Sequence, residues 1–202
     1  MVLTCDIEVT PLPATGQDVG IDLGLSDFLV TDTGEAVPNP RPLRKAEERL
    51  ATAQRALQRK KRGSHRRAKQ RGRFARQCQR VANVRKDFHH KTARALVRAN
   101  DTIYHEDLAV RNMVQNRNPA VQDCAWSQFI AILRGKAAEA GHRVIAVNPR
   151  GTSQTCVCGE PAPKDLSERW HQCPHCHLSL PRDQVSAMIV KGLGRSLQAN
   201  AA

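Results

Sequence analysis

Apolar and polar residues alternate along several short stretches of this 202-residue chain, and each such stretch predicts a strand. The expected strands are 17–24, 28–30, 35–37, 102–106 and 143–147. The turn sequence Asp32-Thr33-Gly34 separates the second strand from the third. Helical periodicity predicts helices at 123–141, with Gly141 as a natural stop, and at 183–197. This succession of strands and helices predicts a mixed α/β domain.

Residues 41–99 instead carry the alternating three- and four-residue spacing of amphipathic helices. Two apolar stripes account for this spacing: Leu43, Ala46, Leu50, Ala53 and Leu57 in the first, and Phe74, Cys78, Val81, Val84, Phe88 and Leu96 in the second. Gly63 and Ser64 interrupt the pattern between them. We therefore expect two long helices that form an antiparallel hairpin, with the apolar seam inward and the polar faces outward.

The same segment carries the whole positive excess of the chain. It contains 21 Lys or Arg and three acidic residues, whereas the complete chain has 32 and 19 and a net charge of +13. Like charges at this density repel one another, so phosphates of a nucleic acid are the partner that best explains them. A solvated helix surface and a membrane surface remain alternatives, although a membrane-binding helix usually carries Trp, Phe or Leu opposite its basic face. The residues expected to bind nucleic acid are Arg59, Lys60, Lys61, Arg62, Arg66, Arg67, Lys69, Arg71 and Arg73.

Composition narrows the class of protein further. Aromatic residues make up only 3% of the chain, so base stacking is not expected to be its main mode of binding. No apolar run approaches the roughly 20 residues of a membrane span, and the N-terminus does not resemble a signal peptide. We therefore expect a cytosolic protein, without a membrane partner. In a reducing cytosol the seven cysteines are expected to be metal ligands or buried thiols, and Cys5, Cys78 and Cys124 are interpreted as small apolar fillers.

Three acidic residues lie where chemistry explains them better than solvation. Asp22 lies inside an apolar strand, Glu106 ends another strand, and Asp183 begins the last helix. If the three carboxylates converge, their hard oxygen ligands suit Mg²⁺ or Mn²⁺. Two such ions about 4 Å apart can activate water for an attack on phosphate. Taken singly, Asp183 is also explained as a helix cap and Glu106 as a surface acid, whereas Asp22 is costly to bury without a partner.

Four cysteines near the C-terminus have the spacing of a zinc site. Cys156 and Cys158 are separated by one residue, and Cys173 and Cys176 by two. Two thiol pairs beside turn-forming residues indicate tetrahedral Zn²⁺. Three nearby histidines could each replace a thiol, namely His171, His175 and His177. Four free surface thiols are the alternative.

Taken together, these stretches resemble the TnpB-type (OrfB) transposases. The resemblance runs through residues 6–192 and rests on five ordered motifs: 20–25 (GIDLGL), 42–50 (PLRKAEERL), 105–108 (HEDL), 148–154 (NPRGTSQ) and 182–183 (RD). It implies a RuvC nuclease domain of RNase H-like α/β fold with a zinc ribbon, which cuts DNA with a guide RNA. By position, Asp22, Glu106 and Asp183 match the catalytic Mg²⁺ ligands of the family. Its zinc ligands match Cys156, Cys158, Cys173 and Cys176.

The resemblance also predicts how the chain is divided. Residues 17–151 are expected to form the RuvC-like domain with the basic hairpin 41–99 inserted. Residues 152–180 are then the zinc ribbon and 181–202 the C-terminal helix. Residues 1–16 are interpreted as the remnant of an N-terminal recognition domain, so the chain is expected to be truncated.

Three functions follow from these patterns. The first is a metal-dependent DNA endonuclease, and the second is an inactive remnant that only binds RNA or DNA. The third is a zinc-ribbon RNA-binding protein without nuclease ancestry, which the five ordered motifs disfavour.

Overall fold

The computed structural model describes residues 9–107, 119–148, 152, 154–163, 165 and 168–200. A five-stranded sheet forms its centre, in the spatial order β3-β2-β1-β4-β5. The five strands are β1 Asp18–Leu23, β2 Asp27–Thr31, β3 Ala36–Pro38, β4 Thr102–Glu106 and β5 Arg143–Val147. β1, β2 and β3 pair antiparallel, whereas β4 and β5 continue the sheet parallel to β1. All five predicted strands are confirmed, and so is the mixed α/β class.

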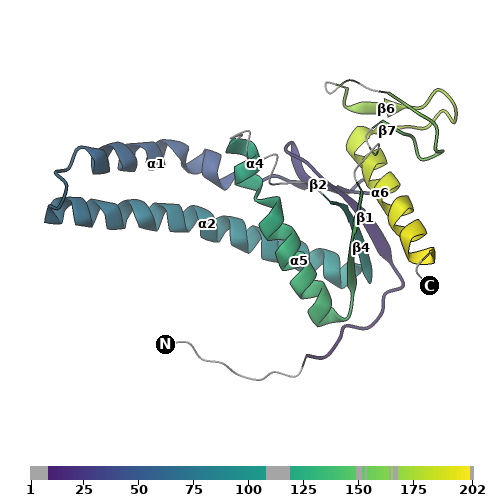
Figure 1. The fold of residues 1–202 in the computed structure, drawn as a ribbon, viewed down its shortest axis with the longest axis horizontal. Coiled ribbons are helices and arrows are strands. Elements are labelled where there is room, and N and C mark those ends of the chain that lie inside the picture. Colours follow the sequence, from purple (N-terminus) through teal and green to yellow (C-terminus); the bar gives the residue numbers. More distant parts are fainter. Residues whose placement is uncertain are drawn as a thin grey trace.

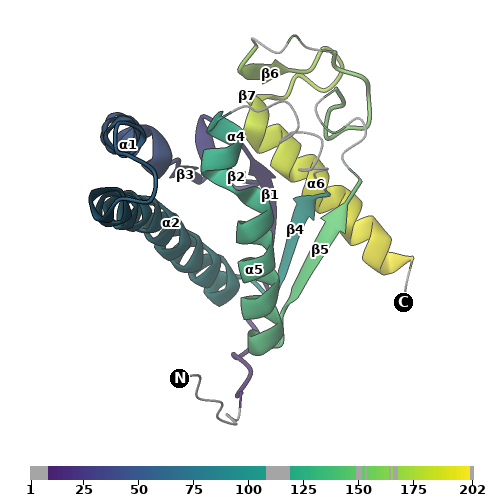
Figure 2. The ribbon, with the colours of Figure 1, turned by 60° about the vertical axis from the view of Figure 1, so that its left-hand side comes forward.

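Helices cover both faces of this sheet (Figures 1 and 2). The helices are α1 Pro42–Gln58, α2 His65–Ala99, α4 Pro119–Cys124, α5 Trp126–Ala140 and α6 Arg182–Ala199. The C-terminal part of α2 and the whole of α5 pack on one face, and α6 packs alone on the other. None of the described helices is long and apolar enough to cross a membrane.

The alternation along β1 and β4 decides which residues meet which layer. Val19, Ile21 and Ile103 are buried against the core side chains of α2 and α5, such as Ala93 and Phe129. Since successive side chains of a strand point to opposite faces, the even-numbered residues of β1 and β4 point towards α6.

α1 and α2 form the predicted antiparallel hairpin, which projects away from the sheet (Figure 1). The first stripe is confirmed, since Ala46 and Ala53 are buried against α2 and its leucines are half-buried. The second stripe is wrong at two positions, because Cys78 and Val84 are exposed. The half-buried Gln77 takes the place of Cys78 in the seam, one turn before Val81, which is buried as the stripe predicted.

Ala125 divides the helix predicted at 123–141. It has a left-handed backbone (φ 48°), so α4 ends at Cys124 and α5 begins at Trp126. At its other end α5 stops as predicted, because Gly141 adopts the left-handed conformation (φ 75°) that favours glycine. Cys124 is a buried filler, as expected, but the same prediction is wrong for Cys78, which is exposed. Cys5 lies outside the described residues.

A small module follows the sheet. β6 Trp170–Gln172 and β7 Ser179–Pro181 form a two-stranded antiparallel ladder beyond the N-terminal end of α6 (Figure 1). These two strands and the other described residues between 154 and 181 form the cysteine module. Its last strand continues directly into α6, so the two share a covalent junction at Pro181.

Candidate active site

Asp22 and Glu106 hold equivalent places on neighbouring parallel strands. The β1–β4 register pairs Ile21 with His105, and Asp22 and Glu106 are the next residue on each strand. Both side chains are half-buried and point towards α6. The sheet therefore brings together two acids that are 84 positions apart in the chain.

Asp183 lies in the first turn of α6, the helix that covers this face. The negative charges of Glu106 and Asp183 both act on Asp22, so the three predicted acids share one region. Their oxygens are not drawn into one tight cluster, however. Among the described residues, only four cysteines form a group of three or more metal-ligating side chains with all ligand atoms within 4.8 Å.

Burial and mutual repulsion make this region unfavourable for negative charge. Burial is the main cause that raises the pKa of Asp22 to about 7, followed by the charges of Glu106 and Asp183, while Arg182 opposes them. Burial also raises the pKa of Glu106, although the Thr152 hydroxyl donates a hydrogen bond to its Oε1 and favours the ionised form. A bound cation would relieve this repulsion, because it neutralises the carboxylates that face one another.

Two glycines let α6 approach the sheet closely. A Cβ added at Gly20 of β1 would clash with the backbone carbonyl of Ala187, and one at Gly194 of α6 would clash with the ring of Tyr104. Without these side chains, the backbones of β1 and α6 meet at Gly20, and the backbone of α6 lies against the Tyr104 ring at Gly194. This close packing sets the height of α6, and of Asp183, above the ends of β1 and β4.

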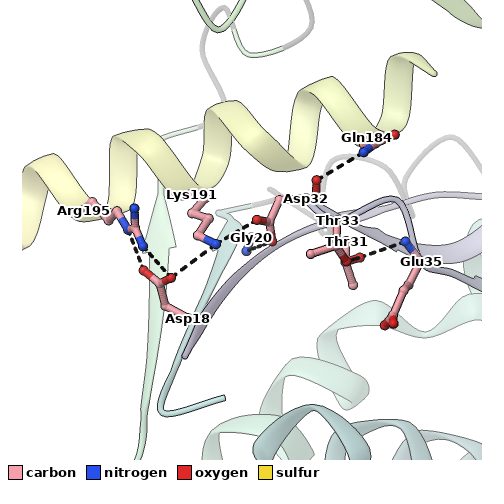
Figure 3. A network of polar contacts seen from close by, with 9 residues as sticks. All are labelled: Asp18, Gly20, Thr31, Asp32, Thr33, Glu35, Gln184, Lys191 and Arg195. Atoms are coloured by element: carbon pink, nitrogen blue, oxygen red, sulfur yellow. Dashed lines mark hydrogen bonds and ion pairs between the residues drawn. The ribbon is translucent and has the colours of Figure 1, made fainter. Parts of the chain in front are cut away.

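A polar network fixes the position of α6 along the sheet (Figure 3). Lys191 Nζ lies 2.8 Å from Asp32 Oδ2 and 3.2 Å from Asp18 Oδ1. Arg195 contacts both oxygens of Asp18 at 2.6 and 2.7 Å. These contacts lower the pKa of Asp18, first through the hydrogen bond from Arg195. Asp32 also accepts a hydrogen bond from the backbone N–H of Gly20 at 3.0 Å.

Sequence reasoning did not find this network. A usable signal exists, because Asp183, Ala187, Lys191 and Arg195 recur every four residues and so occupy one face of α6. Their partners come from β1 and the turn after β2, and no local pattern in the sequence joins those segments.

The four predicted cysteines meet at one point. Cys156 Sγ lies 3.6 Å from Cys176 Sγ, and Cys158 Sγ lies 3.7 Å from Cys173 Sγ. Sulfurs bound to one tetrahedral Zn²⁺ at about 2.3 Å lie about 3.8 Å apart, so this spacing fits such an ion. The cluster could therefore hold a metal such as zinc, even though only one residue separates its first two cysteines.

The backbone around the second pair supports the same geometry. The backbone N–H of Cys176 points to Cys173 Sγ at 3.5 Å, and His177 takes a left-handed conformation (φ 58°) that turns the chain. Backbone N–H groups, first that of Cys176, lower the pKa of Cys173 to about 6 and so favour its thiolate. The described metal-ligating group includes none of the three candidate histidines.

The nine basic residues predicted to bind nucleic acid lie at the far end of the hairpin, in the turn after α1 and the first turns of α2. All are exposed except Arg67, which is half-buried. Its guanidinium donates hydrogen bonds to the carbonyls of Leu57 and Lys60, at 3.2 and 2.9 Å, and so stabilises the turn. Within the described part of the chain, no carboxylate forms an ion pair with any of the nine.

The architecture first gives the class of fold. Two solved structures share its mixed α/β fold. One is titled "Cryo-EM structure of the Cas12f1-sgRNA-target DNA complex", with a TM-score of 0.63, 16% identity and coverage of 90% of this chain and 51% of that chain. Another is titled "Cryo-EM structure of CRISPR-Cas12f Ternary Complex", with a TM-score of 0.61, 14% identity and coverage of 93% and 40%.

Sequence comparison then gives the family. Residues 3–117 match the OrfB_IS605 family model, described as "Probable transposase", and residues 126–190 match the model "Cas12f1-like, TNB domain". The chain belongs to the OrfB_IS605 family. The resemblance to TnpB-type proteins that the sequence motifs predicted is thereby confirmed.

Two curated relatives carry names that state an activity. The chain is 39% identical over 159 residues to "Putative RNA-guided DNA endonuclease" of Streptomyces pristinaespiralis, covering 78% of this chain and 39% of the relative. It is 28% identical over 209 residues to "Putative RNA-guided DNA endonuclease InsQ" of Escherichia coli (strain K12), covering 94% and 52%. The chain therefore spans about two fifths and about half of the lengths of these relatives.

Proposed function

We propose that this chain is the nuclease portion of a transposon-associated, RNA-guided DNA endonuclease, and that it hydrolyses DNA phosphodiester bonds. Its domain of residues 17–151, completed by the C-terminal helix, would be a RuvC-like domain of RNase H-like fold. The carrying observation is that Asp22 and Glu106 hold equivalent positions on adjacent parallel strands, under the helix that begins with Asp183.

The donor chemistry of these three residues fits Mg²⁺ or Mn²⁺. Their carboxylates are hard oxygen ligands, and the repulsion that raises the pKa of Asp22 would be relieved by a divalent cation. When bound, such ions activate water and stabilise the leaving oxygen in phosphate hydrolysis. Asp22, Glu106 and Asp183 would hold the ions, and α6 would keep Asp183 in place through its close contacts with β1.

Zn²⁺ is the metal proposed for the cysteine module, with Cys156, Cys158, Cys173 and Cys176 as ligands. A closed set of four thiolates suits a structural role, because no position is left for water or substrate. β7 continues into α6, so a folded module would also restrain the helix end that carries Asp183.

The basic hairpin, residues 41–99, is proposed as the principal contact with DNA or guide RNA. Within the described residues, Arg85 and Lys91 pair with carboxylates, those of Asp123 and Asp87, whereas the other Lys and Arg side chains of the hairpin have no such ion pair, which favours their neutralisation by phosphates. The printed names of the relatives and the titles of the Cas12f complexes support both partners.

Cleavage of labelled DNA would test the enzyme. The chain is purified with RNA expressed from its own locus and assayed with Mg²⁺ or Mn²⁺, beside Asp22→Asn. Asp87→Asn is the matched control, because it removes the same charge from the exposed surface of α2, where Asp87 pairs with Lys91. Metal-dependent cutting that is lost in Asp22→Asn and kept in Asp87→Asn is the expected result.

The hairpin also favours a second candidate, a protein that binds RNA or DNA without cutting. Its basic surface does not depend on the three carboxylates, so binding would persist where catalysis is absent. Tight, salt-sensitive binding with no cleavage by the chain or by Asp22→Asn would select this candidate over the nuclease.

A further inference from the structure

Trp170 differs from the other aromatic residues of the chain. All seven Phe, Trp and Tyr residues are described, and six of them are buried or half-buried. Trp170 is 58% exposed, more than any other large apolar side chain of the described residues. Since a single exposed apolar residue is ordinary at a protein surface, the orientation and the location of Trp170 decide what it can do.

The exposed indole is also held in one orientation. Its Nε1–H donates a hydrogen bond of 2.8 Å to Ser179 Oγ, across the ladder between β6 and β7. The neighbouring His171 is fully buried, because alternate residues of β6 point to opposite sides. Trp170 therefore presents a fixed aromatic surface to solvent, which lowers the conformational entropy lost when a flat ligand binds.

The position of this surface relates it to the proposed active site. Trp170 pairs directly with Pro181, and Pro181 lies two residues before Asp183. Two residues of chain span at most about 7 Å and paired strands lie about 5 Å apart, so the backbones of Trp170 and Asp183 lie within about 12 Å of each other. A strand of nucleic acid with a phosphate at the three carboxylates would therefore pass close to the indole with a neighbouring nucleotide.

The residues around Trp170 suit a base together with its phosphates. The side chains that share the exposed side of the ladder with Trp170 are uncharged, namely those of Gln172, Ser179 and Pro181. Arg169 and Arg182 adjoin the Trp170–Pro181 pair, so basic residues flank this aromatic face. The face of a base is accessible to an aromatic side chain only in an unpaired strand.

We propose that Trp170 is a stacking platform for an unpaired base of the strand that enters the active site. This inference rests on the proposed function, because the nearby carboxylates supply the reason for a nucleic acid to lie there. The platform adds a positioning residue on the cysteine module, which composition alone did not suggest for so aromatic-poor a chain.

Binding of two fluorescent oligonucleotides would test the platform. One is an oligothymidine, and the other has the same length and charge but abasic sugars. The full chain carries Asp22→Asn, so that cleavage cannot alter the probes, and binding is followed by fluorescence anisotropy. We expect the oligothymidine to bind about fivefold more tightly or better, since a stacked base contributes at least about 1 kcal/mol.

Trp170→Ala should remove that difference while leaving the affinity for the abasic strand unchanged. Unchanged abasic binding would show that the variant is folded, and Trp170→Phe should keep most of the preference. Val157→Ala is the control, since it shortens another exposed apolar side chain of the module, 46% exposed, and should change neither affinity.

The platform is overturned if Trp170→Ala keeps the preference for oligothymidine, if it weakens both strands equally, or if neither strand binds the parent chain. These outcomes are separate from failure of the proposed function. The nuclease proposal alone would be contradicted by a different result. In that case the Asp22→Asn chain prefers the oligothymidine through Trp170, and the chain with Asp22 intact shows no metal-dependent cleavage.

Discussion

The ring of Tyr104 in β4 lies directly against Gly194 in α6, where no side chain larger than hydrogen fits. The Tyr104 hydroxyl also donates a 2.6 Å hydrogen bond to Gln198, one helical turn further along. Tyr104 is two residues before Glu106 on the same strand face, so this contact links the docking of α6 to the strand that carries one of the proposed metal ligands.

Gly194→Ala should therefore destabilise the protein. The added methyl group must displace α6 or the tyrosine ring, and overpacking of this kind costs about 1–3 kcal/mol. Urea denaturation would measure the loss. Gly192→Ala is the matched control, because that glycine lies in the same helix with no atom within 4 Å of the added Cβ, and helix propensity predicts a gain of about 0.5–1 kcal/mol. Equal effects of the two substitutions would contradict close packing at Gly194.

The raised pKa of Asp22 predicts a pH dependence of stability when Mg²⁺ is absent. Between about pH 4 and 7 the folded carboxyl retains a proton that the unfolded one has released, so unfolding becomes easier as the pH rises through this window. Asp22→Asn removes this dependence and should be more stable than the parent above pH 7, by at most about 4 kcal/mol and less after solvent screening. Denaturation of zinc-loaded protein at several pH values would measure this.

Above pH 7, added Mg²⁺ should make the parent more stable than Asp22→Asn, because the ion stabilises the ionised carboxylate of Asp22. Asp87→Asn, which removes an exposed acid, should follow the parent at every pH. A stability difference between Asp22→Asn and the parent that does not change with pH would contradict the raised pKa.

Zinc should be bound at one ion per chain, and Cys176→Ser should reduce its retention. The cluster would lose one of four thiolates, and the short ladder of the module has little else to stabilise it. Metal analysis after dialysis would show the loss, and circular dichroism would follow the unfolding caused by a chelator. Cys78→Ser provides the comparison, because this exposed cysteine of α2 is remote from the cluster and its replacement should leave the zinc content unchanged.

Arg66 and Arg67 should behave differently although they are adjacent. Arg66→Ala removes an exposed charge, so it should weaken nucleic-acid binding and reduce the salt dependence by about one phosphate contact, with little effect on the melting temperature. Arg67→Ala also removes two hydrogen bonds to the carbonyls of Leu57 and Lys60, and should lower the melting temperature as well. Binding titrations at several salt concentrations and thermal melts would compare them. Identical melting temperatures would show that Arg67 does not stabilise the turn.

Local patterns predicted the five strands of the sheet and its long helices, but neither the break at Ala125 nor the ladder of β6 and β7. Alternation located the strands, and the left-handed Gly141 ended α5 where its sequence indicated. The four cysteines were predictable because ligands of a small metal module lie close together in the sequence. The prediction was wrong where two faces of α2 were both plausible, at Cys78 and Val84, because only the position of α1 decides which face is covered.

The sequence by itself determined which groups are available for binding, namely an acid within an apolar strand, a thiol quartet and a dense basic segment. The tertiary structure decided how these groups are related. It set Asp22 and Glu106 in equivalent positions on parallel strands, fixed α6 through Lys191 and Arg195, and left Trp170 exposed beside Pro181. These relationships join residues tens of positions apart, and periodicity within one element carries no information about which other element will pack against it.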